Sequence, residues 1–214
     1  MMRIVTLAAC LMIAVSACAT SPSVPSGPYG QAAQSRFDDF TETAGATDFT
    51  QYNAVFLAPI TVSDEIAERY DIRRPALSGS PRPLSPALVE AKIAELREDL
   101  EAALVQVTSL ADAPGADILT LEVELIALDA NRPTQADFAV SPGLSLQSLY
   151  SGEAGAIVTF STDDTVLAVA RDIDRPGLDL TEPGAGIWST ADRFFRRLAD
   201  KTAALLYSPA PAGA

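Results

Sequence analysis

The clearest pattern in this chain is an alternation of apolar and polar residues between Ile118 and Leu128. Successive side chains of a β-strand point to opposite faces, so this alternation predicts a strand with one buried face. The apolar positions of the segment are Leu119, Leu121, Val123 and Leu125. The polar positions between them are Thr120, Glu122 and Glu124. We therefore expect a half-buried strand here.

Two other segments place apolar residues three and four positions apart, a spacing that predicts amphipathic helices. The first begins at Ser85-Pro86, a capping side chain followed by a proline at the first helical position, and runs to about Val107. Its apolar stripe consists of Val89, Ile93, Leu96, Leu100, Leu104 and Val107. Its polar residues fall largely outside that stripe and are Glu90, Lys92, Glu95, Glu98 and Asp99.

The second predicted helix is C-terminal. It opens with Ser189 and Asp192, which have the spacing of a capping box, and it runs to about Tyr207. Its apolar stripe consists of Phe194, Phe195, Leu198, Thr202, Leu205 and Leu206. A basic side, expected to face solvent or to pair with acids, is formed by Arg193, Arg196 and Arg197. Trp188, just before the helix, is expected to fill the core.

Three more strands complete the predicted fold. Tyr52 to Val62 is a mostly apolar strand, and Asp163-Asp164 favours a tight reversal between strands at 156–162 and 165–173. One helical turn is expected around 64–70. The resulting order, β-α-β-β-β-α, predicts an α+β two-layer sandwich, with an antiparallel or mixed sheet and two helices on one face.

The connection from Asn131 to Gly155 is too apolar for a plain solvated loop, and loops of this length without structure are uncommon. Its candidate partner or ligand surface consists of Leu144, Leu146, Leu149 and Tyr150. One interpretation is a flap or short helix around 144–150 that folds over the protein's own core. The other is a surface that faces lipid or a protein partner.

The N-terminus has the form of a bacterial lipoprotein signal. Arg3 precedes an apolar run from Ile4 to Val15, which is too short for a permanent membrane span. Val15-Ser16-Ala17-Cys18 closes that run as a processing box, so we expect cleavage before Cys18 and lipid on its thiol. Cys10 also ends a possible box, but too few apolar residues precede it. The alternative is an ordinary secretory signal or an uncleaved anchor.

These features divide the chain into four expected parts. Residues 1–17 form the lipoprotein signal peptide, and residues 18–36 form the lipidated cysteine and a flexible tether with almost no large apolar side chains. Residues 37–207 form a single α+β domain. Residues 208–214 form a frayed, disordered tail.

Composition narrows the function mainly by exclusion. The chain has 15 Lys and Arg against 28 Asp and Glu, and this acidic excess argues against a nucleic-acid partner. It has no His, and Cys18 would be the one Cys left after processing. Ordinary zinc and copper sites and hydrolase triads with a His base are therefore not expected. We assign no catalytic residue, no metal ligand and no cofactor.

Carboxylates are the remaining candidates for chemistry, and four of them lie close together in sequence: Asp163, Asp164, Asp172 and Asp174. Glycoside hydrolysis needs a set carboxylate separation, and calcium binding needs a ligand loop, neither of which this spacing specifies. Roles in a turn and at a strand end account for the same residues. Gly184-Ala185-Gly186 does not extend to a dinucleotide-binding fingerprint and is interpreted as a turn or hinge.

Several features together resemble a family of uncharacterised Gram-negative envelope lipoproteins known only as a domain of unknown function. They are the box at Cys18, the Ala58-Pro59-Ile60 strand end, the Ala-Pro-Gly-Ala-Asp-Ile-Leu run at 113–119, and the helix from Trp188 to Leu206. The resemblance implies a cell-envelope lipoprotein that faces the periplasm. In such lipoproteins an Asp directly after the lipidated Cys favours retention in the inner membrane. Ala19 stands at that position here, so the resemblance implies the outer membrane.

Three functions are compatible with these observations. The preferred one is a non-catalytic, lipid-anchored binding or assembly module that engages another envelope component. The second is an auxiliary lipoprotein of a lipid-transport system that holds an apolar ligand beneath the 131–155 segment. The third, in the enzyme class, is a carboxylate-dependent hydrolase.

Overall fold

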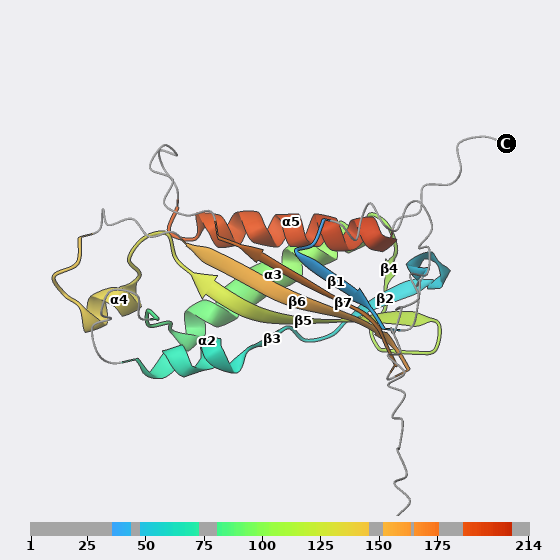
Figure 1. Cartoon of the computed structure of the whole chain (residues 1–214), viewed down its shortest axis with the longest axis horizontal. Coiled ribbons are helices and arrows are strands. Elements are labelled where there is room, and N and C mark those ends of the chain that lie inside the picture. Colours follow the sequence, from blue (N-terminus) through green and yellow to red (C-terminus); the bar gives the residue numbers. More distant parts are fainter. Residues whose placement is uncertain are drawn as a thin grey trace, which may run out of the picture.

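The computed structural model of the chain describes residues 36–43, 48–72, 81–145, 152–163, 165–175 and 186–206. Its centre is a seven-stranded mixed sheet with the order β1-β7-β6-β5-β2-β4, in which β3 also pairs with β5. Two long helices, α3 and α5, lie along this sheet (Figure 1). The expected α+β two-layer sandwich is confirmed.

Three long antiparallel strands form the middle of the sheet: β5 (Ile118–Asp129), β6 (Glu153–Thr162) and β7 (Thr165–Asp174). The alternation expected in β5 is present, because its apolar positions are buried and Glu122 is exposed. The hairpin expected between β6 and β7 also forms. Asp163 in its turn has a left-handed φ of 43°, which Asp tolerates better than most residues.

Shorter strands extend the sheet on both sides. The strand expected at 52–62 consists of two short strands, β2 (Ala54–Leu57) and β3 (Thr61–Val62), which both pair in parallel with β5. The sequence pattern did not indicate the two edge strands. These are β4 (Ser109–Leu110), parallel to β2, and β1 (Asp39–Glu42), antiparallel to β7.

The two predicted helices are α3 (Pro86–Leu104) and α5 (Ser189–Leu206). Ser85 caps α3 as expected, since its side chain accepts a hydrogen bond of 3.2 Å from the Leu88 N–H. The two helices pack against each other, and α5 also contacts β6 and β7. Their apolar stripes join the inner face of the sheet in one core, whose largest fully buried side chains include Phe160, Phe194 and Phe195.

Short helical segments complete the described fold. They are η1 (Phe49–Gln51), α2 (Asp64–Glu68), η2 (Arg69–Asp71) and α4 (Gln135–Val140). The turn expected around 64–70 corresponds to α2 and η2. Figure 1 places α2 and α4 at one end of the sheet and β4 at the other. Within the part of the chain that the structure describes, no helix combines the length and apolar character needed to cross a bilayer.

Lys92 differs from its expected place on the polar side of α3. Its side chain is buried against α5, with Nζ 2.8 Å from Asp192 Oδ1, 2.6 Å from Glu95 Oε2 and 5.7 Å from the centre of the Trp188 ring. Burial alone would lower the pKa of Lys92, but hydrogen bonds to Asp192 and Glu95 outweigh it and raise that pKa. Sequence periodicity misplaced Lys92 because it does not show where a second helix packs.

Candidate binding site at an arginine network

Most of the predicted site residues cannot be placed. Cys18, Leu146, Leu149 and Tyr150 lie outside the described residues, as does Asp164. Leu144 is described and half-buried, and its N–H donates a 3.1 Å hydrogen bond to the Ser141 carbonyl just after α4. The short helix found in this connection is α4, which lies earlier in the chain than the predicted segment.

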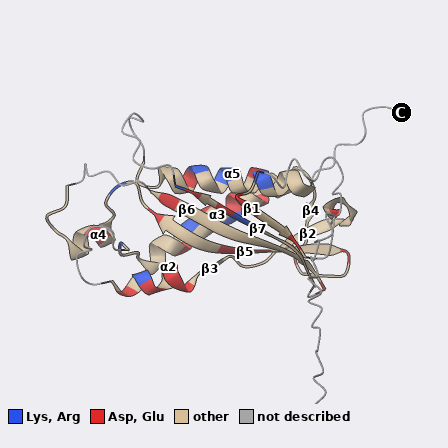
Figure 2. Ribbon diagram, viewed as in Figure 1, with Lys and Arg blue, Asp and Glu red and all other residues tan. Residues whose placement is uncertain are grey.

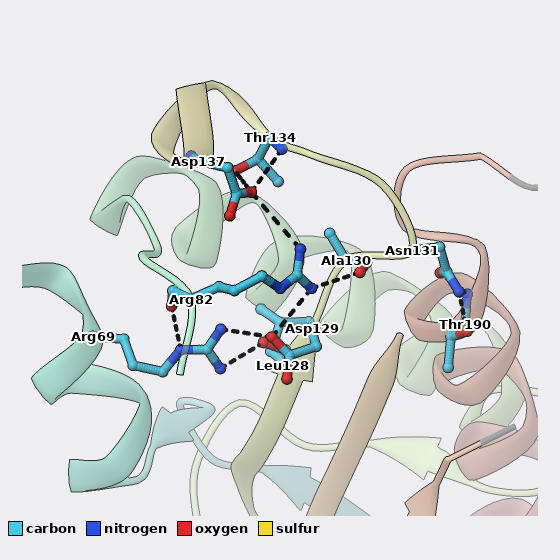
Figure 3. A network of polar contacts seen from close by, with 9 residues as sticks. All are labelled: Arg69, Arg82, Leu128, Asp129, Ala130, Asn131, Thr134, Asp137 and Thr190. Carbon is cyan, nitrogen blue, oxygen red and sulfur yellow. Dashed lines mark hydrogen bonds and ion pairs between the residues drawn. The ribbon is translucent and has the colours of Figure 1, made fainter. Parts of the chain in front are cut away.

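Arg69, a buried residue at the start of η2, is the centre of a polar network beneath that connection (Figure 3). Its Nε donates to the Arg82 carbonyl at 2.7 Å, and its Nη1 donates to the Leu128 carbonyl at 2.9 Å. Its Nη2 donates to Asp129 Oδ1 at 2.7 Å. Because buried polar groups are costly unless they are satisfied, these bonds fix η2 to the end of β5.

Arg82 extends the network towards α4. Its Nη2 donates to the Ala130 carbonyl at 2.6 Å and to Asp129 Oδ1 at 3.3 Å, and its Nη1 lies 3.8 Å from Asp137 Oδ2 (Figure 3). Asp137 also closes a capping box with Thr134, whose N–H donates to Asp137 Oδ2 at 2.8 Å. The network therefore sets both the start of α4 and its position on the body. We call residues 130–145 the α4 arm.

Asn131 fixes the other side of the arm to α5. Its Oδ1 accepts a 3.0 Å hydrogen bond from the Thr190 N–H, and its Nδ2 donates to Thr190 Oγ1 at 2.8 Å. Asn131 therefore satisfies the Thr190 N–H in the first turn of α5. The capping box that the sequence suggested would pair Ser189 with the Asp192 N–H, but that N–H donates to the Trp188 carbonyl at 2.9 Å and the Asp192 carboxylate binds Lys92. Gly152 lies against this pair with a left-handed φ of 60°, where a Cβ would collide with Asn131 Nδ2.

A cavity of about 140 Å³ adjoins the network between α2 and the ends of β5, β6 and β7. We call it the α2 pocket. Its charged lining residues are Glu65, Arg69, Asp129, Glu153, Arg171 and Arg175. The pairing of β5 with β6 is irregular between Leu125 and Ala127, and Ala127 lies opposite Gly155. A Cβ at Gly155 would lie 2.9 Å from Ile173 Cγ1, so the glycine lets the strands pack closely beside this bulge.

The four candidate aspartates do not form one site. Asp163 lies in the β6–β7 turn, whereas Asp172 and Asp174 lie about 30 Å away near the other end of β7, as the rise of a strand requires. Asp172 binds Lys201 Nζ at 2.6 Å, and Asp174 binds Arg197 Nη1 at 3.1 Å. Among the described residues, no group of three or more His, Cys, Asp or Glu side chains is placed to hold a metal ion.

On the basic side of α5, Arg193 and Arg197 pair with acids, whereas Arg196 is exposed, so each of the two expectations holds for part of this side. Arg193 Nε also lies 3.4 Å from Asp174 Oδ2. Charged residues of both signs are visible along α2 and α5, whereas most residues of the central strands are uncharged (Figure 2). These ion pairs hold α5 on β7.

A second cavity, of about 270 Å³, lies at the end of the sheet near η1 and the start of β2. Its apolar lining residues are Phe49, Tyr52, Val55, Val107 and Leu206, and it is also lined by Thr50 and Thr108. The apolar-ligand hypothesis placed such a space beneath the 131–155 segment. This cavity lies elsewhere. It is bordered by η1, the first residues of β2, the segment just after α3 and the C-terminal end of α5.

Comparison with known proteins identifies no family. The structure is an α+β sandwich, but no family model matches the chain and no curated protein matches it. Among solved structures, it is similar to a DUF330 protein from Xanthomonas campestris, at 12% identity and a TM-score of 0.45, over 77% of this chain and 89% of that one.

Two further solved structures have comparable similarity. The PelC dodecamer from Paraburkholderia phytofirmans is 10% identical with a TM-score of 0.39, over 76% of this chain and 97% of that one. A DUF4136 family protein from Bacteroides thetaiotaomicron is 11% identical with a TM-score of 0.37, over 78% of this chain and 95% of that one.

Proposed function

We propose that this protein is a lipid-anchored lipoprotein of the cell envelope that faces the periplasm from the outer membrane and acts as a non-catalytic binding or assembly module. The observation that carries the proposal is the α4 arm, which the Arg69 and Arg82 side chains fix to the body beside a continuation rich in leucine. In this account Leu144, near the end of the arm, and the leucine-rich sequence that follows it bind an envelope protein.

The use of the arginine donors favours binding over catalysis. Arg69 directs its three nitrogens to two carbonyls and one carboxylate of the protein itself. Donors that bind the protein's own groups stabilise the local conformation of a surface. A catalytic centre, in contrast, needs donors directed at a reacting group. Asp172 and Asp174, two of the candidates for the hydrolase hypothesis, likewise form ion pairs with α5.

Photo-crosslinking tests the binding role. A photoreactive amino acid replaces Leu144 on the arm, and a matched variant carries it at Leu110, an exposed position on edge strand β4. After irradiation of intact cells, we expect a discrete protein adduct from position 144 and none from position 110. Equal adduct patterns from both positions, or none from 144, would contradict a binding role for the arm.

The anchor is tested separately at Cys18. In the Cys18→Ser variant, labelling by a radioactive fatty acid should disappear, and the protein should move from the membrane fraction to the soluble envelope fraction. Labelling that persists in this variant would show that another group carries the lipid. Membrane association that persists without labelling would contradict the proposed anchor.

The larger cavity favours a second candidate function, that of a lipid-transport auxiliary. Its five apolar lining side chains could contact part of an apolar ligand. Native mass spectrometry of the purified protein tests this function. A co-purifying lipid that is lost when Val55 is enlarged to Trp would support it, whereas ligand-free protein would count against it.

A further inference from the structure

We infer that the α2 pocket binds a small zwitterionic group, with its oxyanion at Arg171 and its ammonium at Glu65. This inference adds a ligand class to the proposed binding role and rests on that role. The cavity volume of about 140 Å³ suits a group of this size, because pockets for drug-sized ligands run from ~300 to 1,000 Å³.

Inside the pocket, the ion pairs leave one cationic and one anionic side chain without a protein partner among the described residues. Arg69 and Asp129 bind each other at 2.7 Å, and Arg175 binds Glu153 at 2.7 Å. Within the described part of the chain, Arg171 and Glu65 form no hydrogen bond or ion pair, although both line the cavity and both are exposed. The pocket therefore offers one group of each sign to a ligand.

Arg171 is positioned by the strand that carries it. It alternates with Asp172, which faces α5, so the Arg171 side chain points to the opposite face of the sheet. Its neighbours in register are Ile157 on β6 and Asp39 on β1. A planar guanidinium can bind two oxygens of a phosphate or carboxylate in parallel, and this makes Arg suited to such a ligand.

Glu65 supplies the complementary charge from α2, on the other wall of the pocket. A simple anion would meet the Glu65 carboxylate and the acidic field of a chain with net charge −13. A ligand that also carries an ammonium group replaces that repulsion with an attraction to Glu65. The charge pattern therefore favours a zwitterion over a simple anion.

Isothermal titration calorimetry of the full processed chain tests this inference with three probes: O-phosphoethanolamine, inorganic phosphate and ethanolamine. Saturable binding of O-phosphoethanolamine is expected, at least tenfold tighter than binding of either fragment. Arg171→Gln should weaken it at least tenfold, and Glu65→Gln should reduce it to the level of inorganic phosphate. Arg196→Gln, which removes an exposed arginine of α5, is the control and should leave binding unchanged.

Two results would overturn the inference: no saturable binding to the wild-type chain, or equal affinity for O-phosphoethanolamine and phosphate. Near-ultraviolet circular dichroism of each variant verifies that it is folded. Vesicles of phosphatidylethanolamine or of phosphatidylcholine, added to the Cys18→Ser chain, separate the two sources of the ligand. Arg171-dependent preference for phosphatidylethanolamine assigns a lipid headgroup, and binding of the soluble probe alone assigns a free zwitterion.

The failure of this inference can be distinguished from failure of the proposed function. Crosslinking from Leu144 does not depend on Arg171, so Arg171→Gln should keep the adduct whatever the calorimetry shows. If the wild-type chain shows no saturable binding of O-phosphoethanolamine but still gives the adduct from position 144, only the inference about the α2 pocket is overturned.

Discussion

Arg69 and Asp129 are joined by a hydrogen-bonded ion pair of 2.7 Å between Nη2 and Oδ1, which connects η2 to the end of β5. Asp129 also accepts from Arg82 at 3.3 Å, so one carboxylate holds two arginines from different segments. The α4 arm begins at the next residue. The direction of the arm therefore depends on a cluster of polar contacts beside the core residue Leu128, whose carbonyl also accepts from Arg69.

Arg69→Met should destabilise the fold, because it leaves the carbonyls of Arg82 and Leu128 without their donor. Breaking a buried pair costs ~3–5 kcal/mol, and the remaining contact of Asp129 with Arg82 reduces this to about 2–3 kcal/mol. Urea denaturation measures the change in the free energy of unfolding. The control is Arg196→Met, at an exposed position, which should change it by less than about 0.5 kcal/mol. Equal effects of the two substitutions would contradict the role of the network.

Gly152→Ala should destabilise the protein by about 2 kcal/mol or more, since the residue has a left-handed φ and its Cβ would lie 2.7 Å from Thr190 Oγ1. Gly143 is a matched control, because a Cβ there meets nothing within 4 Å. Thermal unfolding of the two variants should show a clear loss for position 152 and little change for position 143. A similar transition temperature for both would show that Gly152 is not under this constraint.

Asn131→Ala removes the side chain that caps α5 and should cost about 1–2 kcal/mol. The loss should concentrate at the first turn of the helix, so amide hydrogen exchange near Thr190 should accelerate more than exchange near Thr202. Asn53→Ala, at an exposed position, is the control. Uniform acceleration along α5, or none, would contradict the capping role.

Asp99 should make stability depend on pH in a defined direction. Burial raises its pKa, Arg196 opposes the shift, and Glu98 adds to it. Because the folded pKa lies above the ordinary value of 3.8, the ionised carboxylate disfavours folding once the pH rises through that range. Asp99→Asn should therefore be more stable than wild type at neutral pH, and the advantage should vanish below the ordinary pKa. A stability advantage that grows on acidification would contradict this sign.

The sequence predicted the layers of the fold because its core elements have strong periodicity. The alternation along β5 and the apolar spacings of α3 and α5 each indicate one buried face, and the structure confirms these elements. The edge strands β1 and β4 could not be predicted in this way. They span four and two residues, which is too short for periodicity to be informative.

The candidate site was much less predictable than the fold. Arg69, Arg82 and Asp129 are isolated charged residues in sequence, and they meet only after η2, the segment before α3 and the end of β5 have packed. The Thr134–Asp137 pair was a local signal that could have been found, since Thr and an acid three residues apart are typical of a helix start. That signal would have placed a helix at 135–140.

The most direct test of the account is photo-crosslinking from position 144 in intact cells, compared between wild-type Arg82 and Arg82→Met. If the network holds the arm for a partner, wild type should give a discrete protein adduct, and Arg82→Met should reduce its yield several-fold while the protein stays folded and membrane-bound. No adduct from the folded wild-type protein, or the same yield from both forms, would contradict the account.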